Sequence, residues 1–422
     1  MKLVESHGAA VQAVANGIHA VPEVSTSIAA AQAAYRFLNN PRVSLRALAA
    51  PLIELARRET ATSCDRYLLV VHDWTQLMYS EQTGKKDRIP LSGKGVPEGY
   101  EALTSLLVSD RDGSPIAPVA ISLRAADGVH CSRSWTVRPP LSPLDELDPA
   151  MSYVDQLSLP RPTVHLIDAE ADSVFHYREW STRPGRLFVV RADDRIVEHG
   201  DREWRCSAIQ KELRDQGTFH FTRPVVYRGK AAEQYVAEVP VRLTRPGQRN
   251  RPRSGDRRRI PGPHLSLRLI ISEVRSLEGV LLATWFLLSS VPLEVDAATI
   301  ALWYYWRWTI ETFFKLLKSG GQQVEQWQQT TAGATTRRIL VASMACTVVW
   351  RLARSQHPLA SETRRLLVRL SGRQMKHGQE FTLPSMLAGL WVLLAMMHVL
   401  EKYTVDDLRA MTAAFLSPPP DS

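Results

Sequence analysis

The sequence has little cysteine, and its few thiols lie far apart: Cys64, Cys131, Cys206 and Cys346. None of them belongs to a CxxC pair, the spacing that is typical of zinc sites and redox centres. A zinc site and a disulfide framework are therefore not expected. Buried, unreactive thiols in a reducing compartment fit the pattern better, so we predict a cytoplasmic protein.

Long hydrophobic runs are also missing from the chain. The first seven residues contain no apolar stretch of the kind found in signal peptides. The most apolar run, residues 386–400, contains His398 and is shorter than the roughly 20 residues that span a bilayer. We expect this run to form a buried core helix, and we predict no membrane partner.

Acidic residues are outnumbered by basic ones. The 422 residues include 52 lysines and arginines against 43 acids, which gives a net charge of +9. Such an excess favours a polyanionic partner, and arginine, which supplies much of it, suits bidentate contacts to phosphate. The hydrophobic content, 45%, is enough for a large core and two or three structural units. No Ser-His-Asp triad and no phosphate-cradling glycine loop stands out.

The order of apolar and alternating segments predicts an α/β fold. Short apolar runs near 67–71, 103–109, 116–123, 163–167 and 186–191 are typical of strands. The first three suggest antiparallel neighbours, and a helix separates the last two. Residues 195–292 alternate in the β manner, whereas the chain before 62 and after 296 has a helical pattern. We predict a mixed five-stranded sheet with helices, interrupted by a β-rich insertion and flanked by helical regions.

Two of the predicted strands end in an aspartate, Asp73 and Asp168. Each alone is weak evidence, because aspartate often ends strands as turn chemistry. If the strands are adjacent, both carboxylates lie at one sheet edge, where Glu311 on a crossing helix would complete a cluster of three. Such a cluster suits two Mg²⁺ ions, which take oxygen ligands and promote phosphoryl transfer. Glu170 and Asp172 are better explained as acids at a helix N-terminus than as a fourth ligand.

The segment 304–318 has an unusual pattern of charge. At about 100° per residue, one helix face spans an arc of roughly 80° and carries Tyr304, Arg307, Glu311, Lys315 and Lys318. The opposite face is apolar and contains Trp306, Ile310, Phe313 and Leu317. One carboxylate among three cations fits a metal ligand beside a phosphate grip. A solvated face with ordinary ion pairs is the alternative.

The spacing Tyr304-x₂-Arg307-x₃-Glu311-x₆-Lys318 resembles the YREK signature of insertion-sequence transposases, which have a DDE triad and an RNase H-like core. Similar blocks precede it in the family's order: AYRFLNNPRVS at 34–44, HDWTQL at 72–77, DAEAD at 168–172 and FVVRA at 188–192. Trp285, seven residues before Pro292, stands where members with a hairpin mechanism carry a base-stacking tryptophan. The resemblance covers residues 30 to 350, approximately.

This resemblance implies Mg²⁺-dependent cut-and-paste transposition through nicking, hairpin formation, hairpin resolution and strand transfer. Asp73, Asp168 and Glu311 would be the catalytic metal ligands for two Mg²⁺ ions, with Mn²⁺ as a substitute. The implied DNA-binding residues are Arg191, Trp285, Tyr304, Arg307, Lys315 and Lys318. The cations would hold phosphates, and Trp285 would stack on a flipped base. The implied partners are double-stranded DNA, as the ends and the target, and a second copy of the chain, at a prokaryotic nucleoid.

The resemblance also implies how the chain divides. Residues 1–62 would be a helical DNA-binding remnant and connector. Residues 63–194 and 293–355 would form the two parts of the RNase H-like catalytic core, with Glu311 in the second part. The β-rich insertion would occupy 195–292 and a C-terminal helical region 356–422.

Several alternatives stay open. One is a catalytically silent DNA-binding relative or an inhibitor of transposition, against which the three retained acids argue. Another is a metal-dependent DNA nuclease without strand transfer, which the YREK set, Arg191 and Trp285 disfavour. Core packing explains Trp285 about as well as base stacking. Eight arginines between Arg242 and Arg259 form either a solvated loop or a contact to the DNA backbone.

Overall fold

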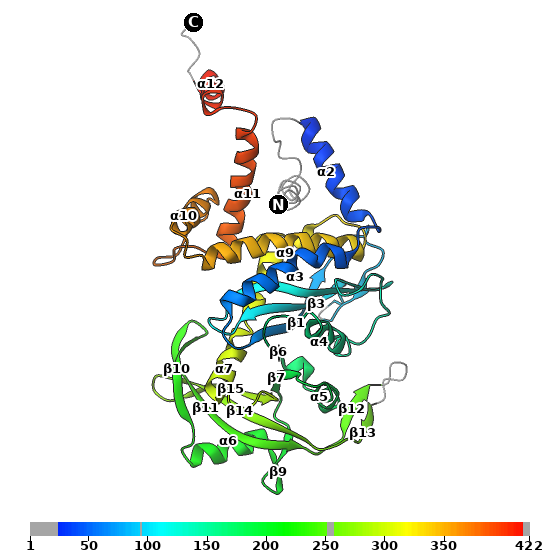
Figure 1. Ribbon diagram of the computed structural model, residues 1–422, viewed down its shortest axis with the longest axis vertical. Helices are drawn as coiled ribbons and strands as arrows, with labels where there is room; N and C mark the ends of the chain where they lie inside the picture. The colour runs from blue at the N-terminus through cyan, green and yellow to red at the C-terminus, as the bar shows by residue number, and fades with distance from the viewer. Residues whose placement is uncertain (1–23, 93–94, 251–256, 417–422) are drawn as a thin grey trace.

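The structure, a computed structural model, describes residues 24–92, 95–250 and 257–416. It is a mixed α/β protein built on a 13-stranded sheet (Figure 1). The strands of this sheet are β1 (Leu68–Met78), β2 (Ile89–Pro90), β3 (Glu98–Ser109), β4 (Pro115–Ala125), β5 (Gly128–Cys131), β6 (Thr163–Ile167), β7 (Leu187–Ala192), β8 (Ile196–His199), β9 (Arg202–Arg205), β10 (His220–Tyr227), β11 (Lys230–Leu243), β14 (Leu265–Ser276) and β15 (Leu281–Ser289). A separate two-stranded ribbon consists of β12 (Gly247–Asn250) and β13 (Arg257–Ile260).

Some helices lie along the upper part of the sheet and extend beyond it, and others lie beside its lower part (Figure 1). The described helices are α2 (Val24–Asn39), α3 (Leu45–Ser63), α4 (Leu147–Asp155), α5 (Val174–Ser181), α6 (Cys206–Asp215), α7 (Ala297–Trp306), α8 (Thr309–Leu317), α9 (Ala332–Arg354), α10 (Ala360–Leu370), α11 (Leu383–Leu400) and α12 (Val405–Leu416), with the 3₁₀ turns η1 (Ala169–Ala171) and η2 (Val324–Gln326). The helical patterns predicted before residue 62 and after 296 are confirmed within the described residues. Residues 1–23 of the predicted N-terminal region lie outside them.

The centre of the sheet has the order β4-β3-β1-β6-β7. β1 pairs antiparallel with β3, which pairs antiparallel with β4. On its other side β1 pairs parallel with β6, and β6 pairs parallel with β7. Parallel neighbours require crossover connections, which here contain α4 and α5. The predicted change from antiparallel to parallel pairing is confirmed.

The β-rich stretch 195–292 continues this sheet. β15 pairs antiparallel with β7, and β14, β11, β8 and β9 follow in order. The predicted number of five strands is therefore too low, because the strands of the insertion join the edge of the same sheet. Helix α6 was not predicted in this stretch. Its ten residues bury Ile209 and Leu213 at helical spacing, a signal that the surrounding β alternation obscured.

Side chains of β1 alternate between two cores. Leu69 and Val71 pack in a hydrophobic core that also contains residues of α8 and α9. Leu68 and Val70 point to the opposite face and pack with residues of α3 and α4. Successive residues of a strand point to opposite faces, so His72 and Asp73 belong to different surroundings although they are adjacent in sequence.

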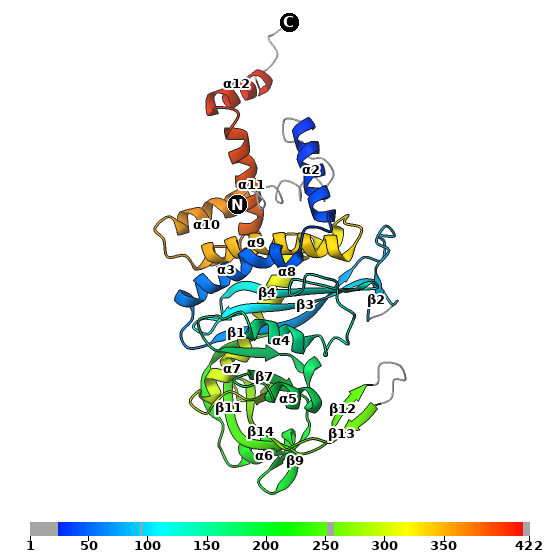
Figure 2. The same ribbon diagram turned by 45° about the vertical axis from the view of Figure 1, so that its right-hand side comes forward.

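The apolar run 386–400 forms most of α11, and its predicted burial is wrong. The first turns of α11 are buried, but Met396, Met397 and Leu400 are exposed. A helix that is apolar all round gives no sequence signal for the side that packs. Within the described residues, α11 is long and apolar enough to cross a membrane, and 28% of it is buried. Figures 1 and 2 show α11 rising away from α9 and the sheet.

Candidate catalytic site: two aspartates around a buried arginine

Asp73 and Asp168 lie at the same level of adjacent parallel strands. The prediction that Asp73 ends a strand is wrong, because β1 continues past it in register with β3. What ends at this level is the pairing with β6, whose last pair is His72 with Ile167. Asp168 follows β6 directly and begins η1, where its carboxylate accepts a backbone N–H at 2.7 Å. The two strands thus bring both carboxylates together.

Arg307 joins these carboxylates. One of its terminal nitrogens, Nη1, donates to Asp73 at 2.9 Å, and the other, Nη2, lies 3.0 Å from Asp168. The arginine is only 3% exposed, and its guanidinium lies 5.6 Å and 5.5 Å from the ring centres of Tyr304 and Trp308. Burial alone lowers the pKa of Arg307, but the charges of Tyr304, Asp168 and Asp73 hold it above its ordinary value. A permanent cation therefore lies between the two acids.

The charge of Asp73 is only partly compensated. Burial of the carboxylate is the main reason that its pKa rises to about 6, and the negative charges of Glu311 and Asp168 raise it further. Arg307 and the backbone N–H of Trp74 act in the opposite direction. Carboxylates that stay this perturbed despite an ion pair are more frequent at functional sites than in scaffolds.

The predicted continuous helix over 304–318 is wrong. α7 ends at residue 306, α8 begins at residue 309, and a turn separates them. The Thr309 hydroxyl donates to the Gly113 carbonyl at 3.1 Å, and Trp306 packs so closely on Gly113 that a Cβ there would lie 2.4 Å from its ring. The turn allows Arg307 to be buried against the aspartates, while Glu311 stays exposed on α8. A helical wheel assumes one continuous helix, so it placed Arg307 and Glu311 on the same face and could not show that one is buried and the other exposed.

The three predicted metal ligands approach one another without full convergence. Glu311 is near enough to influence Asp73. Among the described residues, however, only Asp87, Asp127 and His130 bring three possible ligand atoms within 4.8 Å of one another. That second group could hold a metal ion. Its Asp87 already accepts hydrogen bonds from the Tyr100 hydroxyl and from the backbone N–H at the start of α9.

Besides Arg307, two more of the predicted DNA-binding residues contact Asp168. The Tyr304 hydroxyl donates to Asp168 at 2.9 Å, and burial of Tyr304 raises the pKa of this phenol above its ordinary range. Arg191 lies 3.6 Å from Asp168, and its side chain is 41% exposed. All three side chains contact the acids, and Arg191 is the accessible one, because Tyr304 and Arg307 are buried.

The other three predicted residues differ in their surroundings. Lys315 is exposed on α8. Lys318 instead donates to the backbone carbonyl of Gln76 at 2.6 Å, so it ties the end of α8 to β1. Trp285 is half-buried on β15, where it packs against the main core. It lies two residues from Leu287, the partner of Arg191, and on the same face of the sheet.

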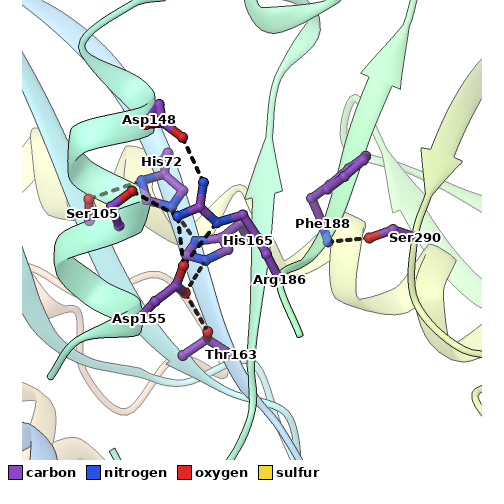
Figure 3. A network of polar contacts seen from close by, with 10 residues as sticks. His72, Ser105, Asp148, Asp155, Thr163, His165, Arg186, Phe188 and Ser290 are labelled. Carbon is purple, nitrogen blue, oxygen red and sulfur yellow. Dashed lines mark hydrogen bonds and ion pairs between the residues drawn. The ribbon is translucent and has the colours of Figure 1, made fainter. Parts of the chain in front are cut away.

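Sequence reasoning missed a buried network on the other face of β1 and β6 (Figure 3). His72 and His165 share a hydrogen bond of 2.8 Å between their ring nitrogens. Ser105 contacts the second nitrogen of His72 at 2.9 Å, and Asp155 of α4 contacts that of His165 at 3.0 Å. Arg186 closes the chain by donating to Asp155 at 2.9 Å. The network links β3, β1, β6 and α4 and fixes the strands that carry the aspartates.

Burial favours the neutral form of both imidazoles in this network. Burial is the main cause that lowers the pKa of His72 and of His165. Burial alone would raise the pKa of Asp155, but hydrogen bonds from His165 and Arg186 lower it to about 2. The sequence did contain a signal for this network. Each of two otherwise apolar strands carries one histidine, and one of these histidines directly precedes Asp73.

A second missed set of contacts ties the loop after β1 to the segment after Glu311. The Tyr79 hydroxyl donates to the Val324 carbonyl at 2.7 Å, and Lys85 donates to the Gln329 carbonyl. Lys85 is 2% exposed and lies over the Tyr79 ring, and its burial lowers its pKa to about 8. These contacts hold α8, and so Glu311, at a fixed place beside β1.

Comparisons with known proteins identified no relative. No protein-family model matches the chain, and no curated protein matches it. The fold and the site therefore define the molecule by themselves, as a mixed α/β protein with an aspartate pair held around a buried arginine.

Proposed function

We propose that the chain is a DNA transposase of the DDE type, which cuts and pastes an insertion sequence by phosphoryl transfer at Asp73, Asp168 and Glu311. The observation that carries the proposal is the gathering of two carboxylates, from adjacent parallel strands, around one cation. The strand order β4-β3-β1-β6-β7, antiparallel and then parallel, supports an RNase H-like core. The order of the YREK-like and acid blocks along the chain supports the family.

The chemistry of the donors suits Mg²⁺ or Mn²⁺. All three side chains offer carboxylate oxygens, the ligands that hard divalent cations take. Arg307 is a cation that both aspartates share, and the pKa of Asp73 is raised mainly by burial and further by Glu311 and Asp168, so a further cation would favour its charged form. Two bound ions would activate the attacking hydroxyl and stabilise the leaving oxygen.

The cations of the site have a second task in this proposal. A guanidinium binds a phosphate through two parallel hydrogen bonds, as it binds a carboxylate. Arg307 would exchange its aspartate partners for a phosphate of the DNA end when metal enters. Arg191 and Lys315, which are half-exposed and exposed, would hold neighbouring phosphates. The Tyr304 hydroxyl would keep Asp168 oriented during this exchange.

The proposed reaction consists of phosphoryl transfers at the DNA end. Hydrolysis breaks a P–O3′ bond and leaves a 3′-hydroxyl. This hydroxyl attacks the opposite strand to give a hairpin, and water opens the hairpin again. The released 3′-hydroxyl then attacks target DNA. Each step exchanges one P–O bond for another, so no protein–DNA bond and no redox partner is required.

The test uses the purified full chain, Mg²⁺ and linear DNA that carries the flanks of its own gene as candidate ends. We expect hairpin-ended fragments and joined products, which are lost with Asp73→Asn and kept with the matched control Asp127→Asn. Cleavage without joining would favour a nuclease instead. Binding without cleavage would favour a silent relative or an inhibitor of transposition.

A further inference from the structure

The β-rich insertion brings a cation close to the candidate catalytic site. In its predicted arginine loop, the side chains of residues 249–258 lie outside those that the structure describes. Arg223 of β10 is described, and its guanidinium lies 5.5 Å from the ring centre of Tyr305 on α7. Figure 1 shows β10 and α7 next to each other. Tyr305 directly follows Tyr304, whose hydroxyl donates to Asp168, so this cation lies against the helix that contacts the acidic pair.

The guanidinium of Arg223 has unused hydrogen-bonding capacity. One of its terminal nitrogens, Nη2, is buried and has no hydrogen-bond partner among the residues that the structure describes. Burial lowers the pKa of Arg223 to about 10, and the group that acts in the opposite direction is the phenol of Tyr305, not a carboxylate. Arg307, in contrast, is buried together with two aspartates. Arg223 is therefore a partly buried cation that is able to take an anionic ligand.

A β-bulge in β10 sets the direction of the Arg223 side chain. The pairing of β10 with β11 shifts between Phe221 and Arg223. Thr222 is the extra residue at this point, and its hydroxyl donates to the Gln234 carbonyl at 3.1 Å. Bulges re-aim side chains and are frequent at sheet edges and beside active sites. The bulge therefore explains why Arg223 turns to α7.

The hairpin that carries Arg223 turns at the sheet edge where the aspartate site lies. Asp168 follows β6, and β7 is parallel to β6, so both strands end at this edge. β15 begins there, because it is antiparallel to β7. The turns of the hairpins β14–β15 and β10–β11 lie at the same end of the sheet. Arg191, one residue before the end of β7, and the β10–β11 hairpin therefore belong to one edge.

The chemistry of this arginine suits a phosphate. A guanidinium binds a phosphate through two parallel hydrogen bonds, and contact with an aromatic ring does not use its N–H groups. A buried charge without a partner costs stability, and an anionic ligand offsets this cost. Tyr305 is 37% exposed, so the contact of Arg223 with its ring lies near the surface. A ligand at the aspartate edge is thus able to approach both side chains.

We propose that Arg223 is a further DNA-binding residue, which holds a backbone phosphate of the DNA end that the acidic site acts on. This inference rests on the proposed function and adds to it a contact from the β-rich insertion. Phosphate contacts fix the position of a duplex and carry no sequence information. Arg223 therefore contributes affinity and register at the site, and not recognition of particular bases.

The experiment measures binding of the full chain to a fluorescent duplex that carries one flank of its own gene, in EDTA at several salt concentrations. Arg223→Gln removes the charge, and Arg223→Lys keeps the charge without the fork of N–H groups. Arg46→Gln is the matched control. Arg46 also lies 5.5 Å from an aromatic ring, that of Trp135, but it belongs to α3, away from β10 (Figure 1). Thermal unfolding of each variant without DNA is measured in parallel.

We expect Arg223→Gln to lower the affinity by about tenfold and to make the salt slope less negative by about 1. Arg223→Lys should keep the slope and lose less affinity, and Arg46→Gln should bind as the unaltered protein does. Without DNA, Arg223→Gln should melt no lower than the unaltered protein, because it removes a charge that has no partner.

Several results would overturn the proposal: equal losses in Arg223→Gln and Arg46→Gln, no loss in either, or a loss with an unchanged salt slope. So would a lower melting temperature of Arg223→Gln, since the arginine would then serve the fold. If the effect of Arg223 appears but Mg²⁺ never yields cut DNA, the proposed function fails while the phosphate contact stands. If cut and joined products form but Arg223→Gln binds normally, only the phosphate contact fails.

Discussion

The two faces of the strand pair β1–β6 differ sharply, although they share a backbone. On the α4 face, burial favours the neutral forms of His72 and His165, and each uses both ring nitrogens in hydrogen bonds. On the α7–α8 face, the carboxylates of Asp73 and Asp168 share the single guanidinium of Arg307. The hydrogen bonds of the first face are made within the protein, and we propose that the second face binds a further cation.

This difference separates scaffold from site. Buried polar networks that are complete make a single arrangement rigid. Clusters of like charge cost stability and persist where a function uses them. The face with His72 and His165 (the histidine face) therefore explains how the aspartates are positioned. The face with Asp73 and Asp168 (the aspartate face) is where we propose that metal and DNA bind.

Removal of one acid should have the largest effect. We expect Asp73→Asn and Asp168→Asn each to lower DNA cleavage by at least about a thousandfold, because carboxylates that hold metal act as a unit. Folding should survive, since the histidine face is untouched. Gel assays of hairpin formation measure the first effect, and circular dichroism measures the second. Cleavage that persists in both variants would place the chemistry elsewhere.

Damage to the histidine face should reduce stability instead. We expect His165→Ala to lower the free energy of unfolding by about 2 to 4 kcal/mol, because it leaves a cavity and removes one buried hydrogen bond each from His72 and Asp155. His176→Ala is a matched control, since His176 is also buried and bonded to an acid but lies on α5. Urea unfolding compares them. Equal losses in the two variants would show that the network has no special role.

Arg307 tests the competition between guanidinium and metal. We expect Arg307→Gln to lower the melting temperature in EDTA, because the buried Asp73 and the partly buried Asp168 lose their shared cation. Added Mg²⁺ or Mn²⁺ should stabilise this variant more than the unaltered protein, with roughly tenfold tighter apparent binding. Calorimetric titration checks the affinity. Weaker metal binding in the variant would mean that Arg307 supports the ions and does not compete with them.

The pKa of Asp73 gives a smaller, pH-dependent effect. Because this pKa is raised from 3.8 to about 6, its contribution to stability is present below the unfolded value and is lost as the pH rises through about 6. Asp73→Asn should therefore be more stable than the unaltered protein at pH 8 without metal, by about 1 to 3 kcal/mol. The difference should vanish near pH 4. A variant that is less stable at pH 8 would contradict this reading of the charge.

The strands that carry the two aspartates could be predicted from the sequence, but the break between α7 and α8 and the histidine network could not. The strands around Asp73 and Asp168 were found because apolar runs of their length are strong signals, and their adjacency follows from the mixed order of elements. The break after Trp306 was missed because it depends on the contact of Trp306 with Gly113, almost 200 positions away. The network of His72 and His165 was missed for the same reason: its partners meet only in the folded sheet.

The central claim is that the aspartate pair, and not the rival acidic group, holds the catalytic metal. The most direct measurement is an anomalous difference map from crystals of the full chain soaked in Mn²⁺. We predict a peak between Asp73 and Asp168, with Arg307 displaced from at least one of the two carboxylates. A peak only at Asp87, Asp127 and His130, or none near Asp73 at saturating Mn²⁺, would contradict the proposed site.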